Sequence, residues 1–257
     1  MNAVRGALAV GWGILVPMAE ILDEDVDPIP PTAERVAARA MVLAAVSCRG
    51  AIEKDAGKAG AEKLRQRILP WLESIGAASE LEPAETALIA TPLGLLDQKA
   101  RFNASWQSEG MAVLAWALHC AELPLIHAQC EPADTANAMG FLDERENTPM
   151  DNPVLRNEDE IGEWTDTYMT LHWRLRLISS HPGPMDYVSC VDATTWYPLR
   201  LDDLELVDND IAIDGVRIDK LDYDKYRQTL SIAQERHQAF NWLVGFEQLY
   251  SQVTTDT

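Results

Sequence analysis

Apolar residues recur at positions i, i+3, i+4 and i+7 through most of the chain, which predicts amphipathic helices. Thr32 and Asp97 precede two of these patterns and are expected to cap them. Pro70 is expected to end the second helix, and Ser79 to open the third in a capping box with Glu82. The predicted helices span 33–54, 59–69, 79–90, 98–121, 158–178 and 222–250.

The pattern changes in two places between these helices. Residues 122–157 contain four prolines and are predicted to be mostly loop. Residues 186–218 are richer in Val, Ile, Tyr and Trp and carry two turn signals, Asp208-Asn209 and Asp214-Gly215. The short strands expected there are Leu204–Val207, Ile211–Ile213 and Val216–Ile218.

The order of elements predicts a mainly α fold, a helical domain with a small antiparallel β-hairpin element before the C-terminal helix. We expect a single helical domain over 32–257, with its β element at about 186–218. An apolar and acidic segment, 1–31, precedes it. The apolar run 6–19 resembles a signal peptide but is too short to span a bilayer, and Pro17 stands where a small residue is expected. We therefore expect a buried N-terminal element.

Several segments are similar to a bacterial family known only as domain of unknown function 4272. They are Arg39–Arg49, Trp106–Glu109 with Leu114–Leu118, Trp173–Arg176, Ser231–Leu243 and Val253–Thr257. The resemblance spans roughly 33–257, and the Glu-Arg-His…Asn-Trp-Leu block is its most specific part. It implies a mostly helical domain and supplies no activity. The chain departs from the family at its N-terminal apolar run and at His119-Cys120.

Acidic residues outnumber basic ones 41 to 21, and the excess is concentrated in three stretches. They are 20–27, 143–163 and 202–224, with local balances of −5, −6 and −7. This charge argues against nucleic acid and anionic membranes as partners, since both require clustered Lys and Arg. The only region with a basic balance, 33–70, is interpreted as a solvated helix face. Four scattered cysteines without paired spacing favour the cytoplasm.

Clustered acidity steers positively charged partners, so the leading hypothesis is a non-enzymatic acidic binding protein that engages a basic protein. Its most concrete form is a bacterial immunity protein that neutralises a basic toxin. The expected interface lies in the third acidic stretch, with two aromatic residues as anchors. Its residues are Asp202, Asp203, Glu205, Asp208, Asp210, Trp196 and Tyr197.

Five charged residues lie within otherwise apolar helical stretches and are expected to meet across packed helices. They are Glu109, Arg174, Arg176, Glu235 and Arg236. Buried charges require partners, so the group is either an internal ion-pair network or a pocket for an anionic ligand. The pocket would make the protein an enzyme or a small-ligand binder. A third hypothesis is a structural subunit of a larger assembly.

Metal and cofactor chemistry have little support in the sequence. His119, Cys120, His127 and Cys130 offer zinc-type ligands, but adjacent helical residues point about 100° apart and suit one ion poorly. No phosphate-binding glycine loop, dinucleotide fingerprint or activated nucleophile motif is present. We therefore expect no metal, no cofactor and no catalytic residue.

Overall fold

The computed structural model describes residues 28–143 and 148–256, and its fold is mainly α, as predicted. These residues form eight α-helices and a small three-stranded antiparallel sheet before the last helix. The helices are α1 (Ala33–Ile52), α2 (Ala59–Ser74), α3 (Pro83–Ala90), α4 (Gln98–Ala117), α5 (Pro132–Ala138), α6 (Glu158–Ser180), α7 (Tyr187–Ala193) and α8 (Tyr223–Leu243). The predictions for the apolar run 6–19 and the acidic stretch 20–27 lie outside the described residues.

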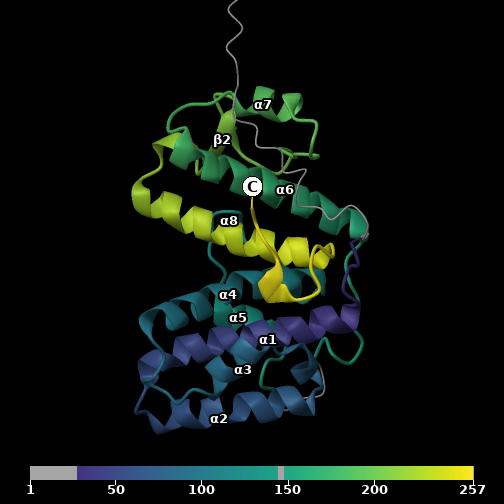
Figure 1. The fold of residues 1–257 in the computed structure, drawn as a ribbon, viewed down its shortest axis with the longest axis vertical. Coiled ribbons are helices and arrows are strands. Elements are labelled where there is room, and N and C mark those ends of the chain that lie inside the picture. Colours follow the sequence, from purple (N-terminus) through teal and green to yellow (C-terminus); the bar gives the residue numbers. More distant parts are fainter. Residues whose placement is uncertain (1–27, 144–147, 257) are drawn as a thin grey trace, which may run out of the picture.

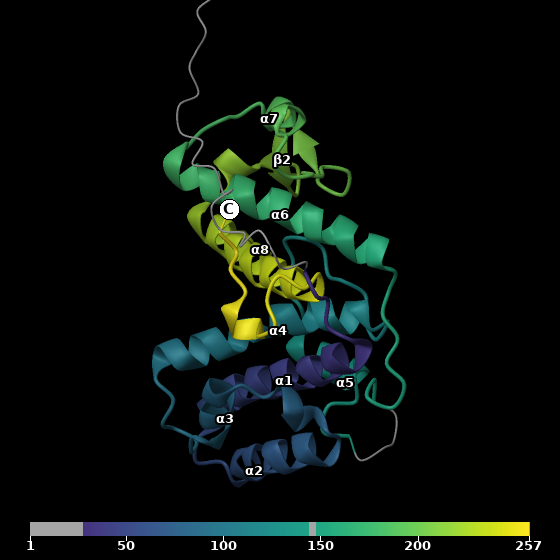
Figure 2. The same cartoon turned by 45° about the vertical axis from the view of Figure 1, so that its right-hand side comes forward.

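The helices are stacked in layers along the long axis of the molecule (Figures 1 and 2). At one end α2 and α3 pack on α1, and α1 packs on α4. The stack continues from α4 to α8 and from α8 to α6, and α7 and the sheet lie at the opposite end. Because α1 has neighbours on both sides, its apolar and alanine positions are almost all buried.

Two glycines permit the close approach of α1 and α4. A Cβ at Gly50 would lie 2.8 Å from the Cβ of Ala104. A Cβ at Gly110 would overlap the hydroxyl of Tyr250 and lie 3.3 Å from a methyl group of Leu43. The first contact lies near the C-terminal end of α1 and the second near its middle, so small residues permit close packing over this part of the pair.

The prediction that the second helix ends before Pro70 is wrong, because α2 continues to Ser74. A proline inside a helix removes a hydrogen bond and costs about 3 kcal/mol. Ile68 and Leu72, on either side of Pro70, are fully buried. Packing of these side chains against the neighbouring layer outweighs the local penalty.

The start of the third helix was also predicted too early. Residues 77–80 form a 3₁₀ turn, and α3 begins at Pro83. Its capping box is formed by Glu82 and Glu85, rather than by Ser79 and Glu82. Proline at the first helical position is favourable, since its missing N–H has no partner there in any helix.

Helices α4 and α8 both end earlier than the sequence predicted, and each is followed by a residue with left-handed backbone. The helix expected to reach 121 ends at Ala117, and His119 follows with φ of 60°. The helix expected to reach Tyr250 ends at Leu243, followed by Gly245 with φ of 88°. The seven-residue helices α5 and α7 were not predicted, because two turns are too short to show a helical period.

The sheet confirms both predicted hairpin turns. Its strands are β1 (Leu206–Val207), β2 (Asp210–Ile213) and β3 (Val216–Arg217), in that spatial order. Both turns have two residues, and Asp208, Asn209, Asp214 and Gly215 all have positive φ, as type I′ turns require. The central strand β2 is completely buried.

Candidate functional site

Arg236 of α8 and Glu109 of α4 form a buried ion pair at the interface of these helices. Neither side chain is exposed, and Arg236 contacts Glu109 Oε2 through Nε at 2.8 Å and Nη2 at 2.7 Å. The guanidinium also donates to the carbonyl oxygens of Pro124, Leu125 and Ala128 and to the hydroxyl of Tyr168. All three of its nitrogens are engaged, so Arg236 has no donor left for an anionic ligand.

Arg174 does not join this pair, contrary to the prediction. It forms a second buried pair with Asp210 of β2, donating from Nε and Nη2 to the two carboxylate oxygens, each at 2.7 Å. This finding also corrects the placement of Asp210 on a partner-binding surface, because the side chain is completely buried. The backbone N–H groups of Ile211 and Met185 donate to the same carboxylate. The ion pair therefore anchors the sheet to α6.

The other two members of the predicted group lie elsewhere. Arg176 is partly exposed, lies 3.6 Å from Asp256 and donates to the carbonyl of Thr255. Glu235 is half-buried, and its Oε2 has no hydrogen-bond partner among the described residues. Burial, and then the charge of Glu109, raise the pKa of Glu235 to about 7. The five residues thus form no common pocket, and the structure supports the internal ion-pair interpretation for Glu109, Arg174 and Arg236.

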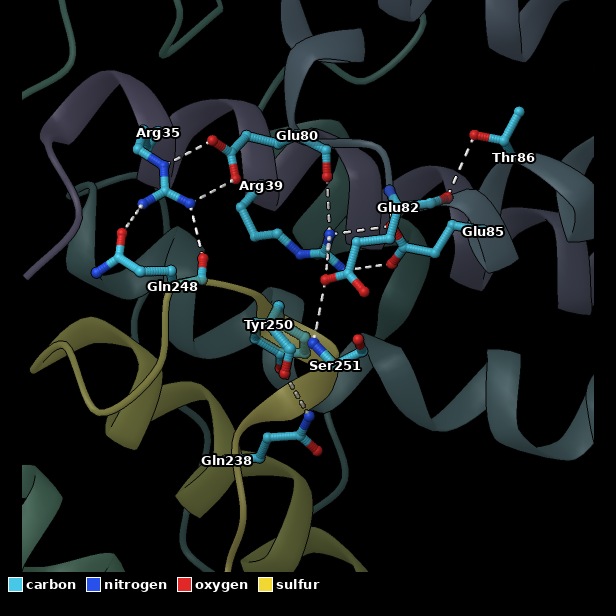
Figure 3. A network of polar contacts seen from close by, with 10 residues as sticks. All are labelled: Arg35, Arg39, Glu80, Glu82, Glu85, Thr86, Gln238, Gln248, Tyr250 and Ser251. Carbon is cyan, nitrogen blue, oxygen red and sulfur yellow. Dashed lines mark hydrogen bonds and ion pairs between the residues drawn. The ribbon is translucent and has the colours of Figure 1, made fainter. Parts of the chain in front are cut away.

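A second network was missed, because the positive charges of 33–70 were interpreted as a solvated face. Arg39 and Arg49 of α1 are buried instead. Figure 3 shows Arg39 paired with Glu85 and bonded to the carbonyl of Glu80, with Arg35 beside it. Glu82 accepts a bond from the N–H of Ser251, which ties the C-terminal segment to α3. The sequence did contain a sign of this burial, because Arg39 lies on the alanine-rich face of the predicted helix.

Two buried histidines, also missed from the sequence, face each other between α6 and α8. The Nδ1 atoms of His172 and His237 lie 3.0 Å apart, so the Nδ1–H of one ring donates a hydrogen bond to the unprotonated Nδ1 of the other. Burial lowers the pKa of both imidazoles. The pair is therefore neutral at neutral pH and contributes one more polar contact to the helix interface.

Several acids lie around a cleft between α6, α7 and residues 198–202, which we call the acidic cleft. It has a volume of about 330 Å³, and Asp166, Asp192 and Asp202 line it together with Arg200. Arg200 lies 3.4 Å from both Glu163 and Asp202 and 3.8 Å from Asp203. The last acid of the second acidic stretch and the first two acids of the third thus lie close to one arginine.

The remaining predicted interface residues differ in how far they are exposed. Asp202, Asp203, Glu205 and Asp208 are all exposed. Trp196 is 43% exposed and packs edge-on against Trp173 of α6. Tyr197 is half-buried and hydrogen-bonded to Asp166. Burial raises the pKa of Asp166, and this hydrogen bond opposes the shift.

The sequence matches the family described as Domain of unknown function (DUF4272) over residues 11–187. The chain belongs to this family. Within this DUF4272 protein, the match covers Glu109 and Arg174 but not the block 231–243 that we expected to be most specific. It also begins inside the N-terminal run, where a departure was expected. No curated protein and no solved structure matches the chain.

In the described part of this DUF4272 protein, residues 28–143 and 148–256, no three His, Cys, Asp or Glu side chains are grouped so that they could hold a metal ion. Among the helices at 33–52, 59–74, 83–90, 98–117, 132–138, 158–180, 187–193 and 223–243, none combines the length and apolar character of a membrane span.

The buried pair predicts a large loss of stability when Arg236 is replaced. Arg236→Met leaves Glu109 as an unpaired buried charge and is expected to lower the free energy of unfolding by about 3–5 kcal/mol. Arg176→Met, which removes an exposed pair, is the matched control and is expected to change it by less than about 1 kcal/mol. Urea unfolding measures both. Equal effects of the two substitutions would contradict the account of Arg236.

Replacing Glu235 by Gln is predicted to increase the free energy of unfolding at high pH but not at low pH. Its pKa in the folded state, about 7, exceeds the ordinary value of 4.5, so its contribution to stability is lost as pH rises toward 7. Glu235→Gln is therefore expected to stabilise the protein at pH 8 by about 1–2 kcal/mol, discounted for partial exposure. At pH 4 it is expected to have little effect.

Urea unfolding of Glu235→Gln at both pH values provides the measurement, with exposed Glu247→Gln as the control. A variant that is less stable than wild type at pH 8 would show that the Glu235 carboxylate is stabilising.

Proposed function

We propose that this protein is a non-enzymatic binding protein whose acidic surface engages a basic protein partner. The observation that carries the proposal is the acidic cleft. Around it lie Glu163, Asp166, Asp192, Asp202 and Asp203, against the single cation Arg200. Most of these carboxylates are exposed, so the cleft presents a strong negative potential to a lysine or arginine side chain.

An aromatic anchor beside the cleft supports a protein partner. Trp196 is partly exposed, and the rings of Trp173 and Tyr197 hold it in place, with centroids 5.6 and 6.0 Å away. A rigid aromatic side chain at the edge of a charged patch is typical of residues that dominate interface energies. The carboxylates then steer the partner and accelerate association.

The most concrete form of this function is a cytoplasmic bacterial immunity protein that blocks a basic toxin. Charge complementarity supports this form, because an acidic inhibitor associates rapidly with a basic toxin and rejects acidic proteins. The competing hypothesis of an anionic ligand at the buried Arg/Glu group loses its basis, because Arg236 is fully hydrogen-bonded inside the protein. The structural-subunit hypothesis predicts an exposed apolar patch and self-association, and it stays a prediction.

Charge reversal at the cleft tests the proposal. Asp192→Lys/Asp202→Lys changes two exposed acids of the acidic cleft, whereas Glu73→Lys/Glu247→Lys makes the same charge change at exposed positions away from it. Each tagged protein is purified from its native cells at low and at high salt, and bound proteins are identified by mass spectrometry.

A stoichiometric basic protein is expected with wild type and with the control variant at low salt. It should be lost at high salt and with the cleft variant. Equal recovery with the cleft variant, or no bound protein at either salt concentration, would refute the proposed binding surface.

A further inference from the structure

A second cleft lies between the C-terminal end of α1 and the first turns of α4, and we call it the cationic cleft. It has a volume of about 360 Å³. Gly50 and Ala51 form its floor, and the missing side chain of Gly50 faces Ala104 of α4. The ring of Phe102, 58% exposed, forms an apolar wall. Lys54 and Arg101 lie on opposite helices at its edge.

Neither cation of this cleft makes an ion pair with the described residues, although acids outnumber bases about two to one in the chain. The nearby acids are already engaged. Glu53 accepts hydrogen bonds from Arg49 and from the N–H of Leu96. Asp55 pairs with Lys58, and Asp97 caps α4. Within residues 28–143 and 148–256, Lys54 and Arg101 therefore present positive charge without a direct ion-pair partner.

An apolar floor between two unpaired cations is suited to a ligand that has both an apolar body and a negative charge. The volume lies at the lower end of the range for small-molecule sites, about 300–1,000 Å³. We propose that the cationic cleft binds a small amphiphilic carboxylate, with the carboxylate between Lys54 and Arg101 and the apolar body against Gly50 and Phe102. This site is separate from the acidic cleft and does not depend on the proposed partner.

Nuclear magnetic resonance of the 257-residue chain tests the proposal with 3-phenylpropionate as the probe. Titration is expected to shift the backbone amide signals of Gly50 and Phe102, with a Kd of about 1 mM, ordinary for a ligand of this size. The neutral analogue 3-phenylpropionamide has the same apolar body, and its binding is expected to be at least about fivefold weaker. Inorganic phosphate has the charge without the apolar body and is also expected to bind more weakly.

Substitutions test whether binding depends on the two cations of the cleft or only on the overall charge of the protein. Lys54→Gln and Arg101→Gln are each expected to weaken 3-phenylpropionate binding about three- to tenfold. Lys63→Gln and Arg227→Gln remove exposed cations elsewhere and are expected to leave the Kd unchanged. The proposal would be overturned if the amide bound as tightly as 3-phenylpropionate, or if the control substitutions weakened binding as much as those at Lys54 and Arg101. The absence of any shift at Gly50 and Phe102 would also overturn it.

Discussion

The buried pair between Glu109 and Arg236 is the constraint on which the arrangement of the central helices depends. A buried charge is tolerated only when its partner and its remaining hydrogen bonds are all in place. Here Arg236 meets this requirement by pairing with Glu109, which fixes α8 against α4. It also donates hydrogen bonds to the hydroxyl of Tyr168 on α6 and to the carbonyls of residues 124, 125 and 128. The second oxygen of Glu109 accepts the N–H of Cys130, which closes the same loop from its other side.

Two other buried arginines also join a carboxylate to backbone carbonyls, although Nη1 of Arg174 has no hydrogen-bond partner among the described residues. Arg49 binds Glu53 and the carbonyls of Thr91 and Pro92 at the end of α3, and Arg174 binds Asp210 and the carbonyl of Gly183. Each guanidinium thus joins a carboxylate to loop carbonyls that would otherwise lack donors. These buried charges stabilise the framework of the protein.

Sequence periodicity predicted the long helices, and turn chemistry predicted the hairpins, because both signals are local. Pro70 was misjudged because the burial of Ile68 and Leu72 is a tertiary effect. The charged group was predicted to be buried, yet its pairing was wrong, since nothing local shows that Arg174 faces Asp210 rather than Glu109. The acidic cleft was not predicted as such, since only Asp202 of the predicted interface lines it. Sequence shows clustered charge, but it does not show that Glu163 of α6 lies beside Asp202 at Arg200.

Hydrogen exchange at the N–H of Cys130 tests most directly whether the Glu109–Arg236 site is a closed part of the framework. This N–H donates to Glu109 over 2.9 Å in a buried position. The account predicts exchange as slow as that of core amides in α8, such as Phe240, because the amide is released only when the helix interface opens. Exchange as fast as that of the exposed loop amide of Asp202 would mean that the site is open to solvent and available to a ligand.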